Sequence, residues 1–248
     1  MSRIGAGSLF LGLLLSSGLL AADREAALTV IDRAVKAHGG AAPLVRSQTA
    51  VRTARGTLHV LAKEVAFSEE LTLQLPERLR SRLEVGEGAQ KGQIVQVVNG
   101  DKGWLLSGGT VQEIGKERLG ELREEAYLLW LTTLLPLQKD QTLELTPLPE
   151  SKLNDQTVNG VKVASKGHAD VKLYFDSKSG LLVKSERRLE EGGVAFDQEY
   201  LYSDHKDSDG GKLPTRITEQ RNGSKFAEWS EISYVFPRQP DETQFGKP

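Results

Sequence analysis

Hydrophobic and polar residues alternate position by position through most of the chain after Thr49. The segment 78–85 is typical, because Leu79, Leu83 and Val85 alternate with arginines and a glutamate. This pattern predicts a strand with one buried face and one charged face. Turn signals such as NGDKG, SKSG, EGG and RNG separate the alternating runs, as in a series of hairpins. We therefore expect one long antiparallel sheet of about ten or eleven strands.

Helical spacing replaces this alternation near the start of the chain. Apolar residues recur with the period of a helix over residues 24–38, and Gly39 and Gly40 follow as a C-terminal stop. A second, short helix is expected to begin near Pro43, because proline suits the first position of a helix. Together these segments are expected to form two helices that precede the sheet.

The segment 116–135 is predicted to form another long helix. It begins with an amphipathic stripe, but residues 126–137 are apolar on nearly every side. Such a helix is buried all round or sits inside something apolar. A single twisted sheet with many strands also tends to curl, and its inner face must then be covered. We predict an α+β, mainly antiparallel fold, in which helices cover one curved sheet and leave an apolar cavity.

The N-terminal segment has the composition of a secretory signal peptide. Arg3 precedes an apolar run, Ile4 to Leu20, that contains no charge. We expect residues 1–21 to be a signal peptide that is cleaved near Ala21–Ala22 after secretion across the inner membrane. Residues 22–248 would then be a single periplasmic domain, since they contain no linker or repeat. An uncleaved membrane anchor is the alternative interpretation.

Composition narrows the possible partners. The chain has 32 Lys and Arg against 34 Asp and Glu, and this net charge of −2 lacks the basic excess of a nucleic-acid binder. It contains no cysteine, so it can form no disulfide and cannot be acylated as a lipid-anchored lipoprotein. We therefore expect no nucleic-acid partner and a domain that is stabilised by its core alone.

The sequence offers no strong catalytic or metal-binding motif. His168 and Asp170 are two residues apart on one strand face and could orient a catalytic imidazole, but no GxSxG serine accompanies them. Asp204, Asp207 and Asp209 are close together, yet their spacing differs from that of a calcium-binding loop. We expect no enzymatic activity, no metal and no cofactor.

The remaining candidate chemistry is apolar binding. The apolar helix and the leucine-rich inner strand face exceed what a single helix-on-sheet contact requires. Two arginines, Arg78 and Arg80, are candidate contacts for an anion or a partner, although cross-strand pairing on a solvated face also explains them. The candidate ligand-binding residues are Leu71, Leu73, Trp104, Leu129, Trp130 and Leu134.

Four short motifs lie along most of residues 22–248. They are the strand pair LTLQLPERLRSRLEV around Pro76, the turn NGDKGW with Trp104, the hairpin FDSKSGLL, and DETQF ending at Phe245. With the N-terminal helix and the central apolar helix, they resemble the LolA-like superfamily of periplasmic outer-membrane lipoprotein-sorting carriers, as a divergent member. The resemblance implies an unclosed, half-open β-barrel of eleven strands, with helices as a lid over an apolar cavity.

The same resemblance implies that the cavity carries acyl chains across the periplasm, from an inner-membrane donor complex to an outer-membrane acceptor. In the better-known carriers a basic residue precedes the strand proline, whereas this chain has Leu75, so no release mechanism is implied. We therefore expect a soluble periplasmic carrier or binding protein for lipidated protein or lipid acyl chains. The alternative is an envelope protein-interaction module with a filled core and no ligand. A hydrolase using His168 and Asp170 is a third hypothesis.

Overall fold

The computed structural model describes residues 12–248 except 87, 89, 90 and 240, with side chains described from Ala21 onward. Most of the predicted signal peptide therefore lies outside the described residues, and only its backbone from Gly12 is seen, as the start of the first helix. Its cleavage near Ala21–Ala22 stays a prediction. Among the described helices, none combines the length and the apolar character needed to cross a membrane.

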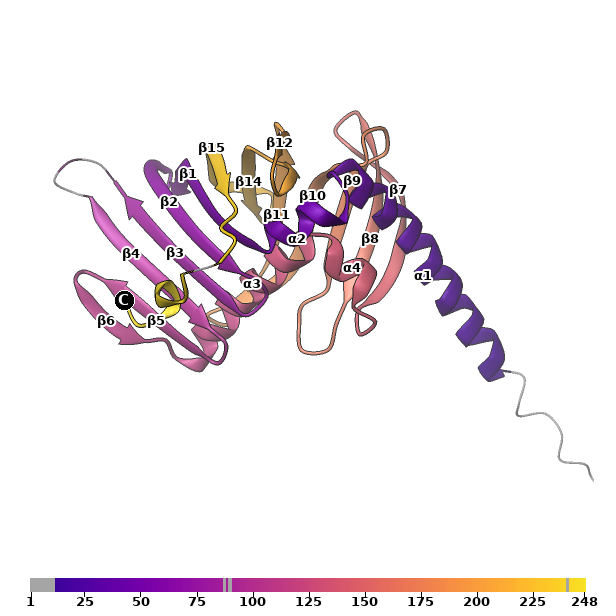
Figure 1. Cartoon of the computed structure of the whole chain (residues 1–248), viewed down its shortest axis with the longest axis horizontal. Coiled ribbons are helices and arrows are strands. Elements are labelled where there is room, and N and C mark those ends of the chain that lie inside the picture. The colour runs from indigo at the N-terminus through magenta and orange to yellow at the C-terminus, as the bar shows by residue number, and fades with distance from the viewer. Residues whose placement is uncertain (1–11, 87, 89–90, 240) are drawn as a thin grey trace, which may run out of the picture.

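A single antiparallel sheet of thirteen strands forms the body of the protein (Figure 1). Its strand order is β6-β5-β4-β3-β2-β1-β15-β14-β11-β10-β9-β8-β7, and a separate pair, β12 and β13, lies outside it. The strands are β1 (Thr49–Val60), β2 (Lys63–Gln74), β3 (Arg78–Val85), β4 (Gly92–Asn99), β5 (Lys102–Ser107), β6 (Thr110–Glu113), β7 (Glu144–Leu153), β8 (Gln156–Ala164), β9 (Val171–Asp176), β10 (Leu182–Glu191), β11 (Val194–Ser203), β12 (Lys206–Ser208), β13 (Gly211–Leu213), β14 (Arg216–Arg221) and β15 (Ser224–Val235).

The sheet curls but does not close, because β6 and β7 form its two ends and do not pair with each other. This confirms the predicted architecture of one curved sheet in an unclosed barrel. The sheet has thirteen strands, more than the expected ten or eleven, and the segment from residue 92 to 113 contributes three of them, β4, β5 and β6. Hairpins connect most neighbours, whereas β1 pairs with β15 from the far end of the chain.

The helices are α1 (Gly12–Ala37), α2 (Ala41–Ser47), α3 (Lys116–Thr132) and α4 (Leu135–Lys139). Gly39 and Gly40, with φ of 101° and 87°, end the first helix and begin the second, as the sequence indicated. The single helix predicted over residues 116–135 is wrong, because the chain breaks at Leu134, whose φ is 67°. The cause is Pro136, because proline lacks the N–H that would bond back to the carbonyl of Thr132 and its ring clashes with that carbonyl, whereas proline is tolerated in the first turn of a new helix, α4.

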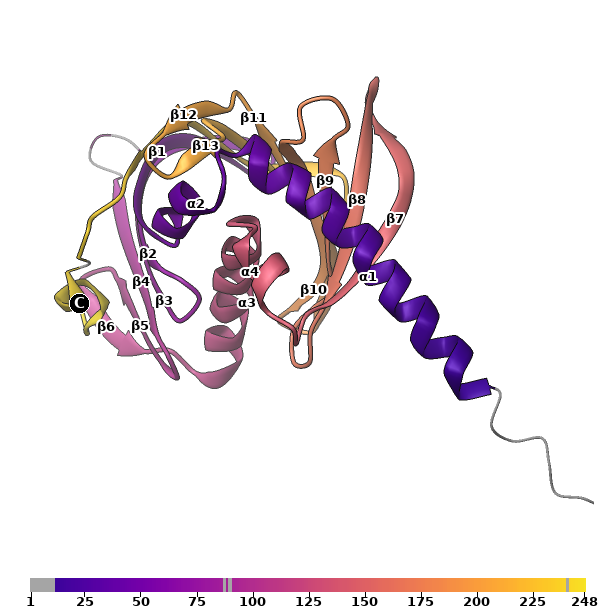
Figure 2. The same cartoon turned by 45° about the vertical axis from the view of Figure 1, so that its right-hand side comes forward.

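The three shorter segments, α2, α3 and α4, lie inside the curve of the sheet, while α1 crosses its β7 end (Figure 2). The apolar segment 126–137 belongs to the core: Leu131, Leu134 and Leu137 are fully buried. One core cluster joins α1, α3 and α4 to β7–β10, and a smaller one joins the first half of α3 to β2, β3 and β4. The helices therefore pack against the two ends of the concave face and leave its middle part open.

A third cluster lies on the convex side of the sheet. The inner face of β3 carries Leu79, so the alternation of β4 places Val95 and Val97 on the outer face. Phe245, at the end of a short 3₁₀ helix formed by Glu242–Phe245, is fully buried against these two valines. The C-terminal segment therefore covers an apolar patch on the outside of the barrel.

Candidate ligand cavity

A cavity of about 680 Å³ lies between α3 and the concave face of the sheet. The alternation of β2 and β3 creates its apolar wall, because it directs Leu71, Leu79 and Leu83 inward and the intervening arginines outward. Helix α3 supplies the opposite apolar wall. The apolar residues around the cavity include Leu71, Leu79, Leu83, Leu122, Leu128, Leu129, Phe196, Ile217 and Trp229.

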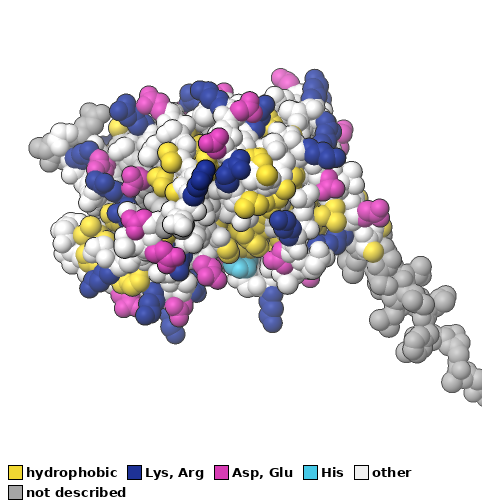
Figure 3. Space-filling view, viewed as in Figure 1, with side chains coloured by type: hydrophobic (Ala, Val, Ile, Leu, Met, Phe, Trp, Pro, Cys, Tyr) yellow, Lys and Arg dark blue, Asp and Glu magenta, His cyan; other side chains and the backbone are white. Residues whose placement is uncertain are grey.

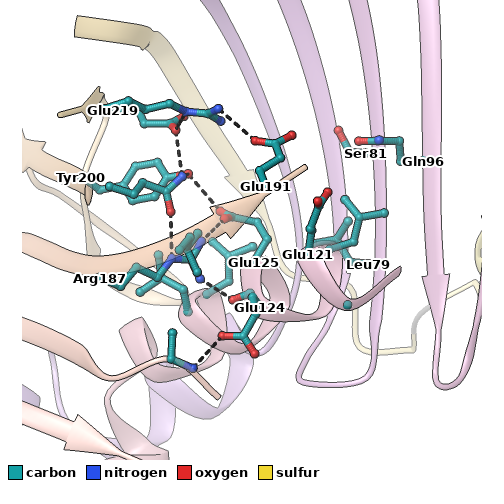
Figure 4. Close-up of a pocket in the computed structure, with 18 of the residues that line it drawn as sticks. Leu79, Ser81, Gln96, Glu121, Glu124, Glu125, Arg187, Glu191, Tyr200 and Glu219 are labelled. Atoms are coloured by element: carbon teal, nitrogen blue, oxygen red, sulfur yellow. Dashed lines mark hydrogen bonds and ion pairs between the residues drawn. The ribbon is translucent and has the colours of Figure 1, made fainter. Parts of the chain in front are cut away.

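The wall formed by β10, β11 and β14 is polar, and Arg187 is its centre (Figure 4). The Arg187 side chain is 2 % exposed, and one of its terminal nitrogens lies 2.5 Å from Glu125 Oε2 on α3. The other donates to the backbone oxygen of Glu124 at 2.5 Å, while Nε donates to Gln198 Oε1 at 2.8 Å. The contacts with Glu125 and Glu124 tie α3 directly to the sheet, and the bond to Gln198 holds Arg187 in place within the sheet.

Further hydrogen bonds extend this polar wall. The amide of Gln198 donates to Glu219 Oε1 at 2.8 Å and to the Tyr200 hydroxyl at 3.1 Å. The Tyr200 hydroxyl in turn donates to Glu125 Oε1 at 3.2 Å. Burial raises the pKa of Glu219, against the opposing effect of Arg221, whose Nε donates to Glu219 at 2.8 Å. The buried polar groups of this wall are therefore largely satisfied by one another.

The floor of the cavity contains an ion pair between Arg52 on β1 and Glu69 on β2, with 2.7 Å between the charged atoms. Both residues are buried. Two N–H groups there have no hydrogen-bond partner among the described residues: Arg52 Nε and Trp229 Nε1. The Trp229 ring packs edge-on against Phe67, with 5.7 Å between ring centroids.

Some of the predicted ligand-binding residues meet at this cavity. Leu71 and Leu129 line it from opposite sides. Leu73 does not line this cavity but lines a separate small hollow of about 90 Å³, which Leu129 also lines. Leu134 is fully buried in the core. A ligand-binding role for these leucines stays a prediction, and the geometry favours Leu71 and Leu129.

The two predicted tryptophans lie elsewhere. Trp104 packs on the convex face with Phe245, because its partner in β4 is the outward-facing Val97. Trp130 lines a separate outer hollow of about 430 Å³ with Val45. Figure 3 shows apolar side chains gathered over this region, around α2 and α4. We therefore leave both tryptophans out of the proposed cavity contacts.

Arg78 and Arg80 project from the opposite face of β3 to Leu79. Arg78 lies 3.1 Å from Glu242, and Arg80 lies 3.5 Å from Glu70 on the neighbouring strand. Cross-strand and tail pairing accounts for both side chains, and their role as anion or partner contacts stays a prediction.

The residues of the polar wall were missed by the sequence analysis. A signal was present in β11, where inward alternation places Gln198 between Phe196 and Tyr200. An amide between two aromatic residues on a buried face needs a hydrogen-bond partner. Arg187 carried a similar signal, because it shares the inward face of β10 with the fully buried Ser185.

The third hypothesis finds no support in the geometry of His168 and Asp170. His168 Nδ1 lies 2.8 Å from Glu124 Oε1 and its ring stacks on Tyr127, whereas Asp170 pairs with Lys162 at 3.3 Å. Within the described part of the chain, no group of three or more His, Asp or Glu side chains is arranged to hold a metal ion.

No protein-family model matches the sequence, and no curated protein matches it. Among solved structures, it is similar to a LolA superfamily protein from Nitrosomonas europaea, with 13 % identity and a TM-score of 0.56, over 89 % of this chain and 97 % of that one. It is also similar to a domain assigned to outer-membrane lipoprotein sorting from Vibrio parahaemolyticus, with 11 % identity and a TM-score of 0.56, over 90 % and 97 %.

A DUF1329 family protein from Desulfovibrio piger gives the same TM-score of 0.56 at 12 % identity, over 89 % of this chain and 97 % of that one. Each of these matches spans nearly the whole of the known structure, while so few residues are identical that the similarity is one of fold. The resemblance inferred from the four motifs is confirmed at the level of the fold: this chain has the fold of these LolA superfamily and lipoprotein-sorting structures.

Proposed function

We propose that this protein is a non-enzymatic periplasmic carrier or binding protein, which holds an acyl chain of a lipid or a lipidated protein in the cavity beneath α3. The observation that carries the proposal is the cavity of about 680 Å³, with leucines from the sheet and from α3 on its walls. The shared fold supports it, since one protein of this fold is described as a lipoprotein-sorting domain. An inner-membrane donor and an outer-membrane acceptor are part of the proposal.

The expected strength of binding suits a carrier. Burial of each methylene group contributes about 0.8 kcal/mol, so ten buried methylenes would contribute ~8 kcal/mol before other costs. Association itself costs an estimated ~4 kcal/mol or more, and side-chain ordering adds to that. The difference between these two free energies leaves an affinity weak enough for the acyl chain to dissociate.

The exposed side of the cavity provides a route for entry. Glu117 and Arg118 at the start of α3 lie opposite Glu190 and Glu191 at the end of β10, and all four residues are exposed. Deeper residues such as Leu71 and Arg52 are buried. Because Arg187 anchors α3, we propose that a chain enters between the start of α3 and the β10–β11 turn, with α3 as a fixed wall.

The interaction-module hypothesis requires a filled interior and no ligand. A cavity of this size between α3 and the sheet is the observation against it. The hollow beside Leu73 measures only about 90 Å³, and Leu134 is fully buried in the core. Among the inner sites described, the larger cavity alone has room for a ligand.

Native mass spectrometry of the protein, purified gently from the periplasm of its own host, tests the proposal. We expect a bound acyl species, and we expect it to be lost in Leu129→Asp, which places a carboxylate on the apolar wall. The matched control is Leu61→Asp, since Leu61 is 92 % exposed and distant from the cavity lining. A ligand-free mass, with no uptake of an added long-chain alcohol by a folded protein, would reject the carrier function.

A further inference from the structure

The charged groups around the cavity carry an excess of negative charge. Its lining contains eight glutamates and five arginines, with no lysine or aspartate, which leaves an excess of three negative charges. Burial raises the pKa of Glu219, one of these eight glutamates, and the net charge of the lining stays negative even if Glu219 is neutral. An acyl chain that enters this cavity therefore brings its headgroup into an acidic environment.

The cations of the lining are already paired. Arg52 pairs with Glu69, Arg187 with Glu125 and Arg221 with Glu219, at 2.5 to 2.8 Å. Arg188 pairs with Asp197 at 2.8 Å, and Arg118 pairs with Glu121 at 2.6 Å and, across the mouth of the cavity, with Glu191 at 3.2 Å. An anionic headgroup would find no free cation here and would have to compete with these carboxylates. The Arg52 Nε, which lacks a partner, is itself shielded from the cavity.

The carboxylates at the mouth are not all paired. Glu117 and Glu190 are exposed, and neither has an ion-pair partner within the described residues. Glu117 also lies in the first turn of α3, where its charge offsets the partial positive charge of the helix start. These two glutamates face the entrance from its two sides and are available to a cationic headgroup.

Volume limits the number of chains. Taking a methylene group as about the size of a liquid water molecule, ~30 Å³, the cavity holds roughly 23 such groups. Its volume of about 680 Å³ thus accommodates one acyl chain of about 18 carbons with part of its head, and not two chains of that length.

From the cavity size and its pairing pattern, we infer that the ligand is a single-chain amphiphile with an amine-bearing, cationic or zwitterionic head, held with its head between Glu117 and Glu190. This inference rests on the proposed function and names its ligand class. It implies that the protein binds an amine-bearing amphiphile more tightly than a fatty-acid carboxylate with the same acyl chain.

Three probes with the same chain separate the two proposals: dodecylammonium, dodecanol and dodecanoate, titrated below their aggregation limits at pH 7.5 with tryptophan fluorescence as the signal. Binding of dodecanol tests the carrier function alone, because it has no charge. We expect dodecylammonium to bind roughly tenfold more tightly than dodecanoate, and this preference to fall as salt is added.

The double variant Glu117→Gln, Glu190→Gln should reduce that preference to roughly threefold or less and leave dodecanol binding unchanged. The matched control is Glu113→Gln, an exposed glutamate on β6 away from the cavity. Equal or tighter binding of dodecanoate, or an unchanged preference in the double variant, would overturn the inference. Failure of all three probes to bind would instead reject the carrier function.

Discussion

Replacing Glu125 with glutamine should destabilise the protein, because it leaves the buried Arg187 without a charged partner. The Arg187 side chain is 2 % exposed, whereas that of Glu125 is 32 % exposed. Breaking a buried ion pair by removing one partner costs about 3–5 kcal/mol. Glu125 is partly solvated, and Arg187 keeps its bonds to Gln198 and to the Glu124 backbone. We therefore expect a loss of ~2 kcal/mol in the free energy of unfolding, which is below that range.

Urea denaturation followed by circular dichroism measures this loss, and thermal unfolding should show a midpoint lowered by about 4–8 °C. The control is Glu117→Gln on the same helix, an exposed residue for which we expect a change within ~0.5 kcal/mol. Adding Arg187→Met, which keeps much of the aliphatic volume, should recover part of the loss, because the unpaired buried cation is removed.

The result that would refute this reasoning is a Glu125→Gln variant as stable as the control, or a double variant whose loss equals the sum of the two single losses. Either outcome would mean that Arg187 and Glu125 are not energetically coupled. Helix α3 would then be held over the sheet by its apolar contacts alone.

Three further predictions follow from the packing. Phe245→Ala should lower the free energy of unfolding by about 3–5 kcal/mol in urea denaturation, yet leave dodecanol affinity unchanged, because Phe245 is buried on the convex face. Leu131→Ala should lower the free energy of unfolding by about 2–5 kcal/mol in the same assay, since Leu131 is fully buried on the core-facing side of α3. Burial lowers the pKa of His205 from 6.5 to about 4, so its unfolded form binds a proton first and stability should fall as the pH drops through this window. His205→Gln should flatten that dependence in denaturation curves recorded from pH 7 to 4.

The curved, unclosed sheet was predictable because its causes are local in the sequence. Alternation along β2 and β3 fixes which residues share a face, and turn signals such as that around Gly180 divide the strands. The break at Leu134 has a local cause too, in Pro136, but its effect was not recognised against the continuous apolar run.

Which face of a strand is the inner one cannot be settled locally when both faces are apolar. Trp104 pairs with Val97 on the outer face, and the residue that covers them, Phe245, comes from the far end of the chain. The polar wall poses the same problem, since Arg187 and Glu125 are 62 positions apart and only the packing of α3 on β10 brings them together. Sequence alternation could indicate a buried polar residue there, but not its partner.

The most direct test of the central claim uses the placement of the three tryptophans. Trp229 lines the cavity, whereas Trp104 lies on the convex face and Trp130 in the outer hollow. A long-chain alcohol brominated along its chain quenches a tryptophan that it touches. We predict strong quenching in the native protein and in Trp104→Phe and Trp130→Phe, and its loss in Trp229→Phe. Quenching that persists in Trp229→Phe and disappears with one of the other two would place the chain outside the cavity and contradict the account.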